Sequence, residues 1–145
     1  MKLNTASQVI SFARQLEEDG ADFYKSLAKK FPENSEILLG FAAENKKGFS
    51  RIERAYYGVI SDAIEGTFTF DIETDDYAFE YDNTRKMTFK DALKIALDLE
   101  NKNCAFYSKA AEQSKSLLAE VPRSFLTMAK LKDERRQKLK ALLER

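Results

Sequence analysis

The chain has 145 residues, of which 43% are hydrophobic and 33% are charged, enough for one domain with a proper core. Lys and Arg balance Asp and Glu at 24 each, so charge favours neither nucleic acid nor an anionic membrane as a partner. The single cysteine, Cys104, excludes an internal disulfide and a four-cysteine metal site, and there is no histidine. No signal-peptide core and no stretch of about 18 apolar residues is present, so we expect a cytoplasmic protein.

Four segments with helical periodicity are predicted within one domain, residues 1–145. The first begins at Thr5, whose spacing from Gln8 fits a capping box, and ends before Pro32. The third begins after Thr88, and Pro122 fits the first turn of the fourth. The connections within each half are short, so each half is expected to form an antiparallel helix hairpin. The expected helices are residues 5–30, 34–58, 88–117 and 122–144.

The connection between the halves, residues 59–87, has a different character. Residues 55–84 contain no Lys or Arg and eight acidic residues. Phe68–Ile72 and Tyr77–Tyr81 alternate apolar and polar residues, which predicts extended chain. A short β-hairpin turning at Glu73–Asp76 is therefore expected, packed on the bundle or on a partner subunit.

The first and third helices repeat one pattern. Glu17 and Tyr24 recur as Glu100 and Tyr107, at a constant offset of 83 positions. Both glutamates lie on apolar stripes, where an unpaired charge is costly. Glu44 lies on a similar stripe of the second helix, and Glu134 on a weaker one of the fourth. Each glutamate is either a metal ligand in the apolar seam or a carboxylate at its edge with the head in water.

These motifs carry a family resemblance. LEEDGADFY, LENKNCAFY, FAAENKKGFSRI and KLKDERRQKLKALL, on the first, third, second and fourth helices, resemble the rubrerythrin-like branch of the ferritin-like superfamily. The resemblance implies an all-α, ferritin-like four-helix bundle whose two hairpins are joined by one long crossover. It also implies a di-iron site used for peroxide reduction or iron oxidation. In that family the second and fourth helices each carry Glu-x-x-His.

Carried over by position, the resemblance makes Glu17, Glu44, Glu100 and Glu134 the metal ligands. Tyr24 and Tyr107 would hydrogen-bond to them from behind. Lys47 and Gln137 stand at the two histidine positions, and Gln137 offers only a weak oxygen ligand. An all-oxygen set suits hard ions such as Fe or Mn. Buried carboxylates can also be neutralised by protons or by a basic side chain, and Lys47 is the candidate for that.

Two functions therefore stay open. The first is a histidine-free dimetal oxidoreductase, peroxidase-like or ferroxidase-like at reduced competence, with an unknown electron donor. The second is a metal-free bundle that acts as a structural or partner-binding protein. If Lys47 enters the seam, the second is favoured.

The basic run of the fourth helix is expected to be a solvated face, and Cys104 a small buried hydrophobe. Charge complementarity between that run and the acidic crossover favours self-association, so a homodimer is expected. The basic run is Lys130, Lys132, Arg135, Arg136, Lys138 and Lys140.

Overall fold

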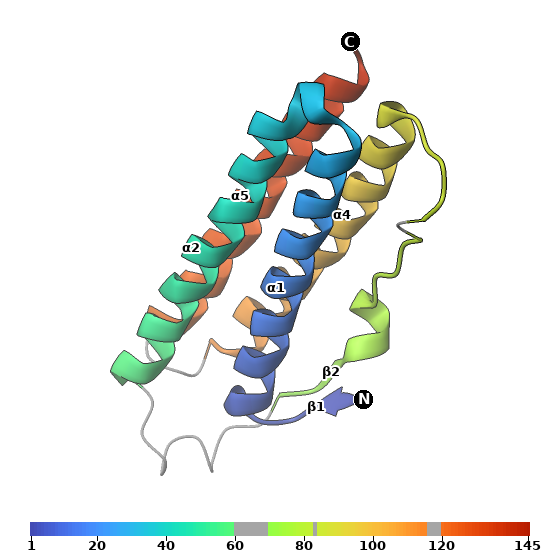
Figure 1. The fold of residues 1–145 in the computed structure, drawn as a ribbon. Helices are drawn as coiled ribbons and strands as arrows, with labels where there is room; N and C mark the ends of the chain where they lie inside the picture. The colour runs from blue at the N-terminus through green and yellow to red at the C-terminus, as the bar shows by residue number, and fades with distance from the viewer. Residues whose placement is uncertain (60–69, 83, 116–119) are drawn as a thin grey trace.

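The computed structural model describes residues 1–59, 70–82, 84–115 and 120–145. Its four long helices confirm the prediction of an all-α four-helix bundle (Figure 1). No helix among these residues is both long and apolar enough to cross a membrane. The helices are α1 (Ala6–Lys30), α2 (Ser35–Val59), α4 (Phe89–Gln113) and α5 (Glu120–Leu143).

Side-chain caps set where two of the helices begin. Thr5 accepts a hydrogen bond from the Gln8 backbone, and the Gln8 side chain accepts from the Thr5 backbone, which completes the predicted capping box. Thr88 and Asp91 form the same box at the start of α4. These contacts satisfy N–H groups that the first turn leaves without intrahelical partners.

Two helix ends differ from the sequence prediction. Helix α4 ends at Gln113 rather than at residue 117, because Ser114 acts as its C-cap and its hydroxyl hydrogen-bonds the Ala111 carbonyl. Helix α5 is already helical at Glu120, so Pro122 lies inside its first turn rather than at its start.

The helices pack as two antiparallel pairs, α1 with α2 and α4 with α5. The bundle closes through α2 against α5 and through α1 against α4. Its core is two clusters of buried apolar side chains, one toward each end, represented by Phe106 and Phe125 in one and by Phe23 and Leu139 in the other. The buried polar residues of the chain include Glu17 and Glu100 of the repeated motif.

The predicted β-hairpin inside the crossover is wrong. Ile72–Glu73 forms a strand, β2, but its partner is the N-terminal strand β1 (Lys2–Leu3), antiparallel, with Leu3 opposite Ile72. Thr74–Tyr77 is a 3-10 turn, and residues 78–82 are extended without strand pairing. Leu3 and Ile72 are buried against the bundle, so the apolar contact selects the N-terminus as partner. Phe68 lies outside the described residues.

The described crossover runs along the α1–α4 side of the bundle and packs on it (Figure 1). The Phe79 and Tyr81 rings meet Phe23 of α1 edge to face, with centroids 5.4 and 4.7 Å away. Tyr77 meets Phe106 of α4 at 5.6 Å. The alternating pattern therefore turns the aromatic side chains of this segment toward the bundle, as it would in a β-strand. The backbone of residues 78–82 nevertheless pairs with no described strand.

Candidate functional site: an internal charge network

The repeated glutamates come together in the middle of the bundle. Glu17 of α1 is 2% exposed and Glu100 of α4 is fully buried. They are close enough for the Glu100 charge to raise the pKa of Glu17. The repeat thus places two carboxylates where water does not solvate them, and each needs a compensating charge.

The compensating charges come from α5. Lys132 Nζ donates to Glu17 Oε2 at 2.8 Å, and Arg135 Nη1 donates to Glu100 Oε1 at 3.3 Å. Lys132 is 2% exposed and Arg135 5%. The prediction that these two residues belong to a solvated basic face is therefore wrong. Two buried cations face two buried carboxylates, and the four charges cancel.

Arg135 holds the network together. Its Nη2 donates to the Phe41 carbonyl at 3.2 Å and to Glu44 at 3.1 Å, and its Nη1 donates to Asn45 Oδ1 at 2.6 Å. Its guanidinium also lies over the rings of Phe41 and Tyr24, 5.0 and 5.3 Å from their centroids. One side chain of α5 thereby contacts α1, α2 and α4, which suits the planar, multi-donor guanidinium better than an ammonium.

Asn45 completes the network from α2. Its Oδ1 accepts from Arg135 and, at 3.4 Å, from Lys132, while its Nδ2 donates to the Glu17 backbone carbonyl. Two glycines make the space. A Cβ at Gly20 would lie 2.5 Å from Asn45 Nδ2, and one at Gly48 would lie 2.5 Å from the Met128 methyl and 3.6 Å from Glu17 Oε1.

The other residues expected at the site lie elsewhere. Glu134, Lys47 and Gln137 are exposed, and Glu44, with its side chain 54% exposed, reaches only Arg135 at the rim. The structure therefore brings together Glu17 and Glu100 but not the set of four glutamates. Among the described residues no group of three or more His, Cys, Asp or Glu side chains is placed to hold a metal ion.

The tyrosines of the repeat lie beside the carboxylates, as their spacing suggested, but in unequal roles. Tyr24 Oη donates to Glu100 Oε1 at 2.7 Å. Tyr107 Oη has no hydrogen-bond partner among the described residues, although it lies near Glu17. Burial and the neighbouring carboxylate hold the pKa of each tyrosine well above its usual range, so both remain neutral.

The acids and the base of the network respond differently to burial. Burial raises the pKa of Glu17, and the Lys132 charge only partly opposes that rise. Burial by itself disfavours the Arg135 cation, but the facing carboxylates, Glu100 above all, raise its pKa above the usual value. Arg135 is thus a permanent positive charge, whereas burial disfavours the ionised form of Glu17.

Several buried polar atoms have no hydrogen-bond partner among the described residues. They include Glu17 Oε1, Glu100 Oε2, Tyr107 Oη, Arg135 Nε and both amide atoms of Asn103. Atoms of this kind are usually satisfied by internal water. Glu17 and Glu100 each use one oxygen for a cation and keep the other free. The network is therefore balanced in charge but not saturated in hydrogen bonds.

The sequence held a signal for Lys132 and Arg135. Along α5 the buried residues recur at alternating steps of four and three. The stripe is Val121, Phe125, Met128, Lys132, Arg135 and Leu139. On α2, Asn45 and Gly48 continue a similar stripe from Leu38 and Phe41. Helical spacing thus puts Lys132 and Arg135 in line with the apolar stripe of α5, but spacing does not decide by itself whether charged side chains at such positions are buried.

Cys104 lies beside the network, half-buried between α4 and α5, with its thiol 3.5 Å from the Ala129 carbonyl. Burial raises the pKa of this thiol, which makes it less reactive than an exposed cysteine.

No protein-family model matches the chain, and neither a curated protein nor a solved structure matches it significantly. The residues themselves therefore carry the functional argument.

Proposed function

We propose that the protein is a ferritin-like bundle of rubrerythrin-like ancestry whose interior is neutralised by its own cations, and that it acts as a metal-independent binding or structural protein. One observation carries the proposal. The ammonium of Lys132 and the guanidinium of Arg135 form ion pairs with Glu17 Oε2 and Glu100 Oε1. A site that supplies its own two positive charges has no electrostatic need for metal ions.

The donor set fits a dimetal centre poorly. Each buried carboxylate keeps one oxygen to which no described residue donates, and Asn45 Oδ1 is already shared by Lys132 and Arg135. A divalent ion at those oxygens would lie close to two fixed cations, which repel it strongly in a dry interior. The proposed function therefore includes no redox reaction at this site.

The register of the site also supports the proposal. Lys132 and Arg135 are three residues apart, the spacing of the Glu-x-x-His motif that the resemblance implies for this helix. Their side chains, rather than those of Glu134 and Gln137, reach the buried carboxylates. We infer that Lys132 and Arg135 have replaced an ancestral pair of metal ligands on this helix.

The first test is the metal content of tag-free protein purified without chelator, followed by anaerobic Fe(II) titration and air exposure. We expect no stoichiometric metal, no oxo-bridge absorption band and no change of melting temperature with iron. About two irons per chain, with such a band on oxidation, would make the protein a di-iron oxidoreductase and overturn the proposal.

The second test rebuilds the ligands. The Lys132→Glu/Arg135→His variant replaces both internal cations with metal-binding groups, so we expect it to gain Co(II) binding with tetrahedral-type absorption and metal-dependent stabilisation. Its matched control is Lys47→His/Gln137→His, which adds two imidazoles at exposed positions. Equal or stronger Co(II) binding by the control would show that the ligand positions are misassigned.

A further inference from the structure

Two opposite sides of the bundle, α1–α4 and α2–α5, carry an acidic segment and a basic row of residues, respectively. The crossover packs along the α1–α4 side, and its acidic residues face outward there. The α2–α5 side has two adjoining hollows, of about 460 and 320 Å³, which share Arg51 as a lining residue.

The wall that α2 gives to these hollows is basic. Lys47, Arg51 and Arg54 follow one another at helical spacing and line the hollows. None of the three forms an ion pair or a hydrogen bond with a described residue of its own chain. They span about 10 Å along the helix axis. We call this stripe, Lys47, Arg51 and Arg54, the basic groove.

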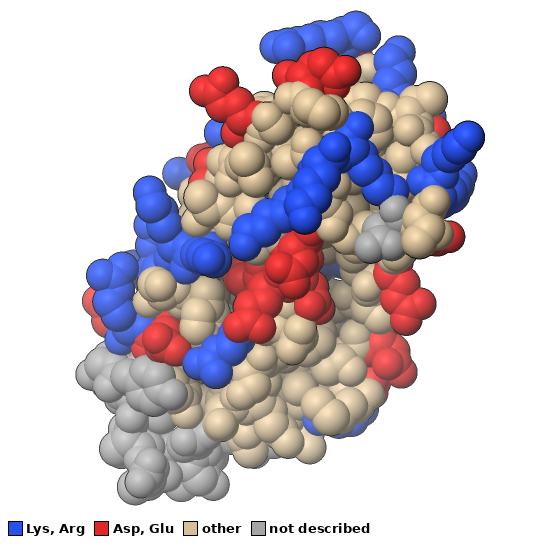
Figure 2. All heavy atoms as spheres, in the orientation of Figure 1, with Lys and Arg blue, Asp and Glu red and all other residues tan. Residues whose placement is uncertain are grey.

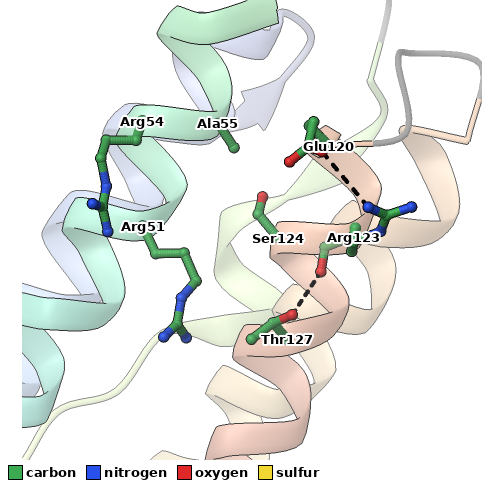
Figure 3. Close-up of a pocket in the computed structure, with 7 residues that line it drawn as sticks. All are labelled: Arg51, Arg54, Ala55, Glu120, Arg123, Ser124 and Thr127. Carbon is green, nitrogen blue, oxygen red and sulfur yellow. Dashed lines mark hydrogen bonds and ion pairs between the residues drawn. The ribbon is translucent and has the colours of Figure 1, made fainter.

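The wall that α5 gives carries both signs of charge. Glu120 and Arg123 line the larger hollow with Ser124 and Thr127, and Glu134 and Lys138 line the smaller one. Figure 3 shows Arg51 reaching toward the gap between the helices, while Arg123 of α5 turns away from α2 toward Glu120, its ion-pair partner at 3.6 Å. The Ser124 and Thr127 hydroxyls donate to carbonyls of their own helix. The opposite charges that α5 brings to the hollows offset one another, so the excess positive charge comes from α2.

The crossover presents the complementary stripe. Because Tyr77, Phe79 and Tyr81 pack inward on Phe23 and Phe106, the acidic residues between and beside them point outward. Figure 2 shows acidic side chains at the molecule's right edge, the side of the crossover in Figure 1. We call the exposed residues Asp75, Asp76, Glu80 and Asp82 the acidic stripe. Asp76 and Glu80 form no ion pair with any described residue.

We propose that the acidic stripe of one molecule binds the basic groove of a second copy. The stripe and the groove lie on opposite sides of one bundle, so the contact is head-to-tail and each molecule keeps one free stripe and one free groove. Such a contact builds open, head-to-tail oligomers rather than a closed symmetric dimer. This proposal identifies a second copy of the protein as the partner for the binding function proposed above. It rests on surface charge and does not depend on which groups neutralise the buried carboxylates.

Both surfaces are held in shape before they meet. The crossover is fixed by its aromatic contacts and by Lys102 Nζ, which donates to the Ala78 carbonyl at 2.8 Å, and the groove is fixed on a helix. Little ordering is therefore required on binding. The charges are exposed, so the attraction is modest and screened by salt.

Sedimentation velocity over a range of protein concentrations tests the contact at about 20 mM and about 300 mM NaCl, where screening differs strongly. We expect concentration-dependent growth at low salt that disappears at high salt. Arg51→Gln/Arg54→Gln should abolish it from the groove side, and Asp76→Asn/Glu80→Gln from the stripe side. Lys90→Gln/Lys94→Gln removes two positive charges from α4 and should leave association unchanged.

Mixing the two defective variants decides the geometry. Each keeps the surface that the other has lost, so the mixture can form one contact per pair and should stop at a dimer, whereas the wild type grows further. A symmetric dimer that resists salt and both double variants would overturn the proposal. So would a wild type that stays monomeric at low salt, including one that instead binds tripolyphosphate through Arg51 and Arg54.

Discussion

Lys132 Nζ lies 2.8 Å from Glu17 Oε2, and each of the two side chains is only 2% exposed. The pair joins α5 to α1 across 115 positions of sequence in the middle of an apolar bundle. A buried ion pair contributes little net stability compared with apolar packing, but removing one member leaves a charge with no compensation. The relation between Lys132 and Glu17 is thus one of mutual dependence, and it can be measured.

Lys132→Met should lower the free energy of unfolding by about 3–5 kcal/mol, because it leaves the Glu17 carboxylate buried and unpaired. Urea denaturation at pH 7 measures the loss. The matched control, Lys130→Met, changes an exposed lysine of the same helix and should stay within about 0.5 kcal/mol of wild type. Glu17→Gln/Lys132→Met should recover part of the loss. Similar losses in the two single variants would contradict the buried pair.

The two repeated tyrosines should respond differently to loss of the hydroxyl. Tyr24→Phe removes a buried hydrogen bond to Glu100 and should destabilise the protein by about 1–3 kcal/mol. Tyr107→Phe removes a buried hydroxyl that has no hydrogen-bond partner within the described part of the chain, and it should be near neutral or stabilising. Paired urea titrations give both values. A large loss in Tyr107→Phe would instead reveal a firmly held internal water at that hydroxyl.

Glu17 should make stability fall as pH rises. Its pKa is raised in the fold, chiefly by burial, so the folded state holds the proton more tightly than the unfolded chain. Its contribution is complete below the unfolded value of about 4.3 and is lost as pH rises through the folded pKa. Carbon-13 NMR of the Glu17 carboxyl should place its midpoint above that value, and the stability of the wild type should fall relative to that of Glu17→Gln as pH rises over the same window.

Asp91 provides the opposite sign within the same chain. Hydrogen bonds from the Thr88 backbone and side chain, in that order, lower the pKa of its carboxylate. Its contribution is present above the unfolded value of about 3.9 and is lost as pH falls through the folded pKa. Asp91→Asn should therefore lose stability relative to wild type at pH 7 and less at low pH. A Glu17 midpoint below that of Asp91 would refute the assignment of their environments.

The glycines of α1 and α2 offer a matched pair. Gly20→Ala should destabilise, because the new Cβ would displace the Asn45 amide from the Glu17 carbonyl. Gly40→Ala meets nothing within 4 Å in mid-helix, so it should stabilise by about 0.5–1 kcal/mol through helix propensity. Thermal melts of both variants suffice, and the same sign for both would contradict the packing of Asn45.

The sequence by itself determined the helices and the buried position of the two repeated glutamates. Apolar periodicity gave four helices, and the spacing of Thr5 with Gln8 and Thr88 with Asp91 gave two of their starts, because these signals are local. The repeat also put Glu17 and Glu100 in the seam, since both copies of the motif surround the glutamate with apolar neighbours on one helix face. These results need no knowledge of what lies across the bundle.

Only the tertiary structure decided what neutralises those carboxylates. Successive side chains of an α-helix differ in direction by about 100°. A shift of the helix register by one residue therefore decides whether Glu134 or Arg135 points inward. The sequence of α5 alone does not determine this register, because the inward positions are themselves charged. Burial of a cation becomes favourable only when Glu17 and Glu100 of the other helices lie opposite it. The pairing of β1 with β2 was decided in the same way, by the apolar contact that Leu3 and Ile72 make after the bundle has formed.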